Sequence, residues 1–183
     1  YIYHKRSLAE KRVRAEVKAR TFEAFQIASH IYNINKNRLS VAQIKQLVHD
    51  SLYAASWDDG KGYYFAESMA GIEMINRNTP ELEGQNVMEF KDSKGTYIMK
   101  EFIKVAASPA REGFVSYYFS KPDQPGVDVP KISFIKYFEP FDWVIGNGKY
   151  ILDEEENIKK EVVERLAQIK YGSDGYIFAA TWN

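Results

Sequence analysis

Residues 113–150 read GFVSYYFSKPDQPGVDVPKISFIKYFEPFDWVIGNGKY, and this stretch decides the fold. Runs rich in aromatic and β-branched residues are typical of β-strands. Three such runs occur here, at 114–119, 131–138 and 143–151. Only residues 139–142 separate the last two runs, which is short enough for a hairpin. The stretch therefore predicts an antiparallel meander.

The first two of these strands are joined by a segment of a different kind. Residues that favour turns are frequent in it: Pro122, Pro125, Gly126 and Pro130. We therefore expect a loop at this place. The middle strand follows it and begins with Lys131. A lysine at the start of a strand is usually solvated, so the pattern alone favours an exposed Lys131.

The composition limits the class of protein. The chain has 183 residues, 45% of them hydrophobic, enough for one domain with an apolar core. Lys and Arg together number 25, as do Asp and Glu, so the net charge is zero and nothing favours a nucleic-acid surface. The sequence has no cysteine, which excludes disulfides, thiol catalysis and cysteine zinc sites. It also has no apolar run of membrane-spanning length and no signal peptide, and because it begins without Met we expect a piece of a longer protein.

The first 35 residues contain neither proline nor glycine and many good helix formers, so one long helix is expected over 1–35. Its first part carries seven basic side chains between Lys5 and Arg20 against two acidic ones. Its second part places apolar residues at helical spacing. The helix is either a surface helix that lies on a sheet or a stalk that leaves a membrane.

The central segment, 36–152, is predicted to hold the sheet. Ser40 begins a helix as its N-cap, with Gln43 as the capping-box partner. Two further strands are expected at 63–67 and 72–76, which makes five strands in all. Apolar residues at helical spacing predict another helix over 98–106.

The last segment, 153–183, is predicted to begin with a helix that Asp153 caps together with Glu156. After this helix, residues 173–179 repeat the Gly-Tyr-x-Phe-Ala pattern of residues 60–66. The repeat is either a chance match or the opening of a second copy of the same module.

Few residues offer chemistry. The three histidines lie on the two predicted N-terminal helices without paired spacing, so no metal site is expected, and no cofactor is implied. No serine has a nucleophile-elbow context and no carboxylate pair indicates acid–base work, so the domain is not expected to be an enzyme. Four side chains offer donors to a small anion: Lys131, Tyr117, Arg77 and Asn76. On the residues alone, they are more simply strand and loop residues.

The joint occurrence of several motifs resembles a Cache type 2 domain, a PAS-like extracytoplasmic sensor module of bacterial receptors. The order and spacing of these motifs agree over roughly residues 20–170. The matching elements are the Gly-Tyr-x-Phe strand, Pro80-Glu81-Leu82-x-Gly84-x-Asn86, Lys91-Asp92-x-x-Gly95, Gly113-Phe-Val-x-Tyr117, Pro130-Lys131-x-Ser133 and Trp143-Val-Ile-Gly146-x-Gly148-x-Tyr150.

The resemblance implies an α+β fold in which a long N-terminal helix packs on a five-stranded antiparallel sheet. The other face of the sheet would form a small pocket, and the ligand would be a small organic acid such as acetate, propionate, pyruvate or lactate. Carried over by position, Lys131 and Tyr117 would be donors and Phe119 a wall, with Ser133 and Tyr150 at the same site. Asn76 stands where the family commonly has histidine. Arg77 replaces the proline that follows, and would pair with the carboxylate.

The resemblance also implies a function. The parent protein would be a transmembrane histidine kinase, chemoreceptor or diguanylate cyclase anchored in the cell membrane, with this domain in the periplasm. The domain would bind its ligand without catalysis, and could form a homodimer through the N-terminal helix. The alternative is a Cache-fold spacer that serves dimerisation and has no ligand.

Overall fold

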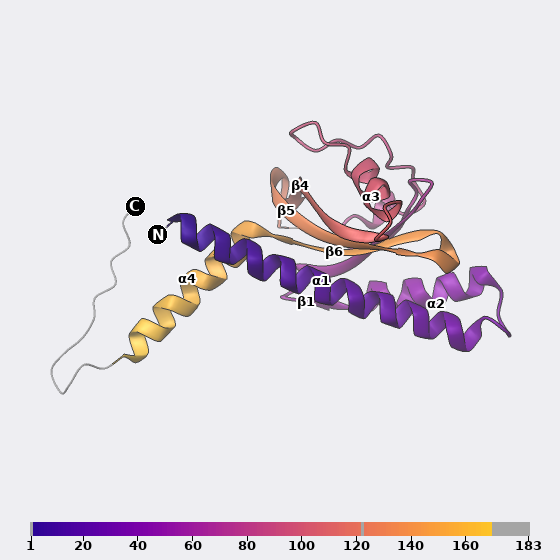
Figure 1. The fold of residues 1–183 in the computed structure, drawn as a ribbon, viewed down its shortest axis with the longest axis horizontal. Helices are drawn as coiled ribbons and strands as arrows, with labels where there is room; N and C mark the ends of the chain where they lie inside the picture. Colours follow the sequence, from indigo (N-terminus) through magenta and orange to yellow (C-terminus); the bar gives the residue numbers. More distant parts are fainter. Residues whose placement is uncertain (1, 122, 170–183) are drawn as a thin grey trace.

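The computed structural model describes residues 2–121 and 123–169, and its longest element is the helix α1 (Ile2–Asn35). This helix runs along the sheet as one unbroken rod (Figure 1). The residues that it buries recur every three or four positions and are mostly small: Ala9, Val13, Val17, Thr21, Ala24 and Ala28. Small side chains bring the helix close to the sheet, where Thr21 Oγ1 donates a hydrogen bond to the Phe134 carbonyl at 2.9 Å. The predicted long helix on a sheet is confirmed.

Helix α2 (Val41–Ala54) turns back beside α1 (Figure 1). The predicted capping box is confirmed, because Ser40 Oγ accepts from the Gln43 N–H and Gln43 Oε1 accepts from the Ser40 N–H. The buried residues Ile44, Val48 and Leu52 face the sheet from this helix.

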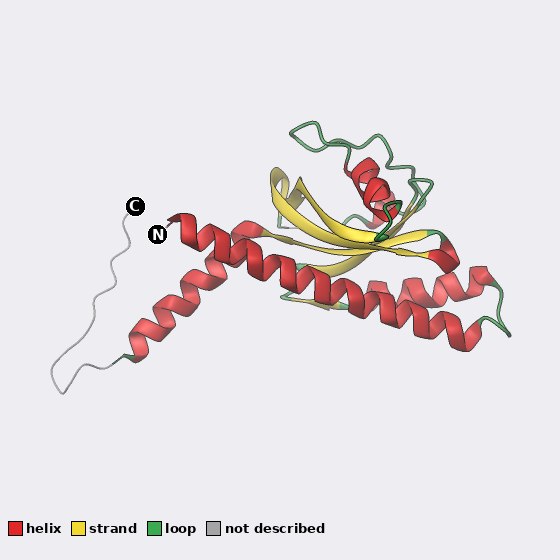
Figure 2. Ribbon diagram, in the orientation of Figure 1, coloured by secondary structure: helices red, strands yellow, loops and turns green. Residues whose placement is uncertain are grey.

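The sheet is antiparallel throughout (Figure 2). Its strands are β1 (Ser56–Trp57), β2 (Gly62–Ser68), β3 (Glu73–Asn76), β4 (Glu112–Lys121), β5 (Gln124–Phe138) and β6 (Trp143–Tyr150). The order is β1-β2-β6-β5-β4, with β3 paired to β2. All five predicted strands are present, and the two-residue β1 is added to them.

The two faces of the sheet are covered differently. Helices α1 and α2 cover one face, and α3 (Ile98–Ala106) lies on the other together with the loop segment that precedes it (Figure 2). Helix α4 (Ile151–Gln168) continues directly from β6 and packs on α1 near its N-terminal end (Figure 1).

Two details of the sequence interpretation were wrong. The expected loop around Pro125 and Pro130 is mostly strand, because β5 begins at Gln124 and pairs with β4 from there. Its pairing with β6 begins only at Lys131, so residues 124–130 form an edge where proline needs no hydrogen-bond partner for a missing N–H. Helix α4 begins at Ile151 without a side-chain cap, and Asp153 forms an ion pair with Lys121 instead of capping it.

Candidate ligand-binding site

A cavity of about 190 Å³ lies between the sheet and the α3 layer. It is below the roughly 300–1,000 Å³ of pockets that hold drug-sized ligands, so its ligand would be small. Most of its lining is apolar or aromatic, including Phe65, Val87, Met99 and Phe102. The polar groups among the lining residues are Tyr63, Glu67, Glu73, Asn76, Lys91, Asp92, Tyr117, Tyr118, Ser120, Asp128 and Lys131.

Lys131 is the buried cation of this cavity, with only 3% of its surface exposed. Its Nζ donates a hydrogen bond to the Tyr63 hydroxyl at 3.0 Å. Three aromatic rings surround the ammonium, with the centroids of Tyr63, Phe119 and Tyr150 at 5.0, 5.0 and 5.1 Å. Among the described residues no carboxylate lies within 4.0 Å of Nζ. Lys131 is therefore a buried charge without an opposite charge in contact, contrary to the exposed lysine that the strand pattern favours.

Gly148 on β6 makes room for this lysine. A Cβ atom at position 148 would lie 2.6 Å from Lys131 Cε and 2.2 Å from Ser133 Oγ. Both distances are too short for non-bonded atoms, so any larger residue here would displace Lys131 or Ser133. The glycine in the Gly146-x-Gly148 motif is thus explained by the path of the Lys131 side chain.

The other predicted site residues lie in two groups. Tyr117, Phe119 and Asn76 line the cavity with Lys131. Ser133 and Tyr150 stand behind it: the Ser133 and Tyr117 hydroxyls are 2.8 Å apart, and the Tyr150 hydroxyl donates to the Ser120 carbonyl at 2.7 Å. Burial raises the pKa of Tyr117 well above its ordinary value, so this phenol stays protonated and can donate.

Arg77 is not part of the site. Its guanidinium donates to the carbonyls of Tyr53 and Ala54 at the end of α2, at 3.2 and 3.3 Å. The expected pairing of Arg77 with a ligand carboxylate is therefore wrong. The position directly before it, Asn76, is on the inward side of β3, and its Oδ1 accepts from the backbone N–H groups of Asn78 and Thr79.

Two buried carboxylates were missed by the sequence interpretation. Glu67 on β2 and Glu73 on β3 are direct register partners, are 5% and 4% exposed, and both line the cavity. Glu67 Oε2 and Glu73 Oε1 have no hydrogen-bond partner among the described residues. The alternation of Tyr63, Phe65 and Glu67 on one face of β2 is the pattern that could have indicated an inward-facing Glu67.

Burial changes the protonation of this pair. It raises the pKa of Glu67 well above its ordinary value, and the charge of Glu73 adds to this effect. Burial also raises the pKa of Glu73 to about 7, although Asn76 and Lys131 oppose the shift. Burial therefore favours the protonated form of Glu67, and Glu73 changes charge near neutral pH.

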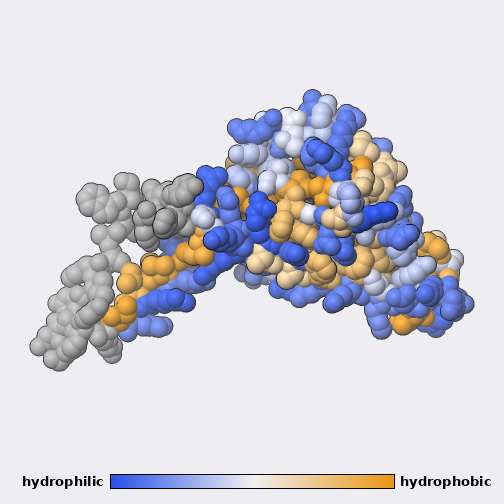
Figure 3. Space-filling view, viewed as in Figure 1, coloured by the Kyte–Doolittle hydropathy of each residue, from blue (hydrophilic) through white to orange (hydrophobic). Residues whose placement is uncertain are grey.

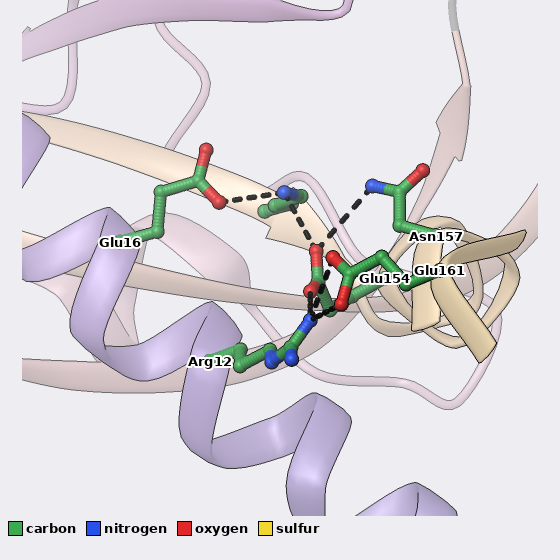
Figure 4. Close-up of polar contacts among 6 residues, drawn as sticks. Arg12, Glu16, Glu154, Asn157 and Glu161 are labelled. Atoms are coloured by element: carbon green, nitrogen blue, oxygen red, sulfur yellow. Dashed lines mark hydrogen bonds and ion pairs between the residues drawn. The ribbon is translucent and has the colours of Figure 1, made fainter. Parts of the chain in front are cut away.

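On the opposite face of the sheet a second, partly buried lysine is paired with two carboxylates. Lys149 Nζ lies 2.6 Å from Glu16 Oε2 on α1 and 2.9 Å from Glu154 Oε2 on α4. Arg12 on α1 reaches both Glu154 and Glu161 (Figure 4). This ionic network joins α1, α4 and β6, the strand that also carries Gly148 and Tyr150 on its cavity face.

A family model described as a Cache domain matches residues 1–183, and the chain belongs to this family. Among curated proteins it resembles the methyl-accepting chemotaxis protein McpP of Pseudomonas putida, with 25% identity over 57% of this chain and 19% of that protein. It also resembles the sensor histidine kinase MctS of Rhizobium johnstonii, with 30% identity over 54% of this chain and 21% of that protein. The chain thus spans about a fifth of the length of these relatives.

Solved structures agree with this assignment. A methyl-accepting chemotaxis protein from Vibrio parahaemolyticus is 26% identical, with a TM-score of 0.70 over 84% of this chain and 97% of that one. A periplasmic sensor domain of a chemotaxis protein is 28% identical, with a TM-score of 0.65 over 78% and 96%. A Cache chemosensory domain described as recognising carboxylic acids shares the fold, at 23% identity and a TM-score of 0.65 over 77% and 97%. The predicted family, fold and extracytoplasmic location are confirmed.

None of the described helices combines the length and the apolar character that a membrane span requires. No group of three or more potential metal ligands occurs in residues 2–121 and 123–169. Apolar side chains are exposed along α4 (Figure 3), namely Leu152, Val162 and Val163, and Ile169 directly after the helix is exposed as well. The predicted second Gly-Tyr-x-Phe module, at 173–179, lies outside the described residues, and the predicted homodimer remains a prediction.

Proposed function

We propose that this Cache domain is the ligand-binding module of a transmembrane signalling receptor, and that its ligand is a small carboxylate bound by Lys131. The observation that carries the proposal is the buried ammonium of Lys131, which faces a small cavity and contacts no carboxylate among the described residues. A buried charge is costly unless it is paired. A ligand carboxylate would supply the missing partner, in a site whose aromatic walls exclude water and strengthen the interaction.

Other residues support a carboxylate at this place. The Tyr63 hydroxyl accepts from Lys131 and keeps its own proton as a second donor, and Tyr117 is held nearby by Ser133. The carboxylic-acid-recognising Cache domain of the same fold supports a ligand of this class, although that likeness concerns the fold alone.

The same geometry provides a route from the cavity to the helices. Tyr150 contacts Lys131 and is also the residue that precedes α4. Its neighbour Lys149 points to the other face and holds Glu16 of α1 and Glu154 of α4. A ligand that draws Lys131 and Tyr150 together would shift β6, and with it the junction of α1 and α4. Such a ligand signals only if it binds one arrangement better than the other.

A thermal-shift screen against carboxylates of two to four carbons tests the proposal, with sugars as controls. A ligand at 100 times its dissociation constant adds roughly 2.7 kcal/mol to the free energy of unfolding, which raises the melting temperature measurably. We expect a saturable shift that disappears in Lys131→Ala. No shift with any carboxylate, from a folded sample without bound ligand, would favour the ligand-free spacer instead.

A further inference from the structure

We infer that the ligand carries an ammonium group as well as a carboxylate, and that Glu67 and Glu73 bind this ammonium while Lys131 binds the carboxylate. The inference rests on the proposed function and names the ligand class within it: a short amino acid in its zwitterionic form. It is carried by two buried glutamates that line the cavity, each with one oxygen that has no hydrogen-bond partner among the described residues.

The glutamates and the lysine lie at different ends of the cavity face. Along β6, the residue that pairs with Glu67 is Val144, whereas the residue that pairs with Lys131 is Tyr150. No ion pair within 4.0 Å joins Lys131 to either glutamate among the described residues. The cavity therefore presents a positive end and a negative end, separated along the strands, to whatever it encloses.

Glu67 and Glu73 are buried, and each has one carboxylate oxygen without a hydrogen-bond partner among the described residues. Carboxylates that face each other across paired strands repel, and a buried polar atom without a hydrogen bond is costly. Here both side chains are about 95% buried, and one oxygen of each has no partner in the described chain. An ammonium group supplies three donors and a positive charge, which would satisfy both oxygens at once.

A metal ion suits this pair less well. Calcium takes six to eight oxygen ligands, and magnesium requires near-ideal octahedral geometry. Two carboxylates do not approach such a set, and the described residues hold no cluster of three or more potential metal ligands. Two carboxylates without further oxygen ligands are therefore better suited to an ammonium group of the ligand than to a metal ion.

The charge of the lining leads to the same conclusion. Four acidic side chains line the cavity, namely Glu67, Glu73, Asp92 and Asp128, against Lys91 and Lys131. The two aspartates are already bonded: Asp92 accepts from three backbone N–H groups and Asp128 from one. A simple alkanoate would neutralise Lys131 but leave the two glutamates unpaired. A zwitterion would match both ends of the cavity without adding net charge.

The test compares amino acids with acids of the same shape in which a methyl group replaces the ammonium. The pairs are glycine with propionate, alanine with isobutyrate, β-alanine with butyrate, and γ-aminobutyrate with pentanoate, which together sample the distance between the two charges. Isothermal titration on the whole domain gives the dissociation constants. We expect at least one amino acid to bind tenfold or more tightly than its partner acid. If every amino acid binds equally or more weakly than its partner acid, the inference is overturned while the carboxylate site stands.

Variants assign the preference to the glutamates. Glu67→Gln and Glu73→Gln should each reduce the preference for the amino acid over its partner acid at least fivefold. Glu89→Gln, an exposed acid outside the cavity, is the matched control and should leave the ratio unchanged. An unaltered ratio in both cavity variants would overturn the inference. Should either variant fail to fold, the comparison on the unaltered domain still decides it. Lys131→Ala tests the carboxylate site separately from the ammonium site. If this variant loses binding of all acids and amino acids, the carboxylate site is supported, and if it still binds them, the carboxylate site is contradicted.

Discussion

Two lysines on opposite faces of the same sheet, Lys131 buried and Lys149 partly buried, have opposite surroundings. Lys149 on the helix face lies within 2.9 Å of two carboxylates, Glu16 and Glu154. Lys131 on the cavity face is more deeply buried, yet it has only a phenol and three aromatic rings around its ammonium. The two residues belong to neighbouring strands of one meander, so the strand pattern alone does not distinguish them.

The difference separates a structural charge from a binding charge. A partly buried ion-pair network that is complete within the chain can hold three elements together, as Lys149 does for β6, α1 and α4. A buried charge that is left incomplete lowers the stability of the free domain and is useful only when something else completes it. We therefore regard the helix face as the scaffold and the cavity face as the part that responds to a ligand.

The largest expected effect concerns the ligand. In Lys131→Met, the stabilisation by a saturating carboxylate, roughly 2.7 kcal/mol at 100 times the dissociation constant, should be lost. The melting temperature with and without ligand measures it. Lys149→Met is the matched control, since it removes the same ammonium from the other face, and it should retain the ligand-induced shift. A normal shift in Lys131→Met would contradict the assignment of the two lysines.

The next effect is the dependence of stability on pH. Burial raises the pKa of Glu73 from its ordinary 4.5 to about 7 in the folded domain, with Asn76, Glu83 and Lys131 as further influences. The folded state therefore holds a proton that the unfolded state has already lost. The stability from this group is complete below about pH 4.5 and decreases as the pH rises to about 7, by at most about 1.4 kcal/mol per pH unit. Urea unfolding of the ligand-free domain from pH 4.5 to pH 8 should show this decrease, and Glu73→Gln should weaken it. Parallel profiles for the two proteins would refute the prediction.

A smaller effect is expected at Gly148. A methyl group at this position would lie 2.6 Å from Lys131 Cε, so Gly148→Ala should displace the ammonium from its three rings. We expect ligand affinity to fall about tenfold, or about 1.4 kcal/mol, in an isothermal titration. The control is Ala107→Ser at the end of α3, which should leave the affinity unchanged. Gly84→Ala would not serve as a control, because Gly84 has a positive φ of 83° that an alanine would strain. Unchanged affinity in Gly148→Ala would mean that Lys131 tolerates the displacement.

The smallest effect concerns the scaffold. Glu16→Gln removes one of the two partners of Lys149, while Glu154 keeps the lysine paired. The Glu16 side chain is 30% exposed, so the cost should be about 1 kcal/mol or less in urea unfolding. Ligand affinity should not change. A loss of several kcal/mol would show that the network depends on α1 more than its geometry indicates.

The sequence predicted the fold well because the signals for it are local. Aromatic and β-branched runs located the strands, and Ser40 with Gln43 located the start of α2. Lys131 and Tyr117 were reached through the spacing of family motifs, and both line the cavity. The errors arose where the local structure depends on a partner that is distant in the sequence. Residues 124–130 form a strand because β4 pairs with them, and Asp153 forms an ion pair with Lys121 instead of capping α4.

Strand alternation could have indicated that Glu67 faces inward, but its pairing with Glu73 was beyond sequence reasoning for a similar reason. Glu67 and Glu73 lie on two strands joined by a turn, and their direct opposition depends on a register that shifts by a bulge between Ala66 and Glu67. Arg77 shows the converse case. It follows Asn76 directly but lies just beyond the end of β3, and its guanidinium donates to carbonyls at the end of α2 instead of entering the cavity.

The most direct test of the account is the free energy of unfolding of Lys131→Met and Lys149→Met, measured by urea without ligand beside the unaltered domain. Lys149→Met leaves the buried Glu154 with Arg12 and Asn157 as its remaining partners, and should lose about 1–3 kcal/mol. Lys131→Met removes a buried charge that the chain does not pair, and should be as stable as the unaltered domain or more stable. If Lys131→Met loses as much stability as Lys149→Met, Lys131 is part of the scaffold, and the cavity is not built around a charge reserved for a ligand.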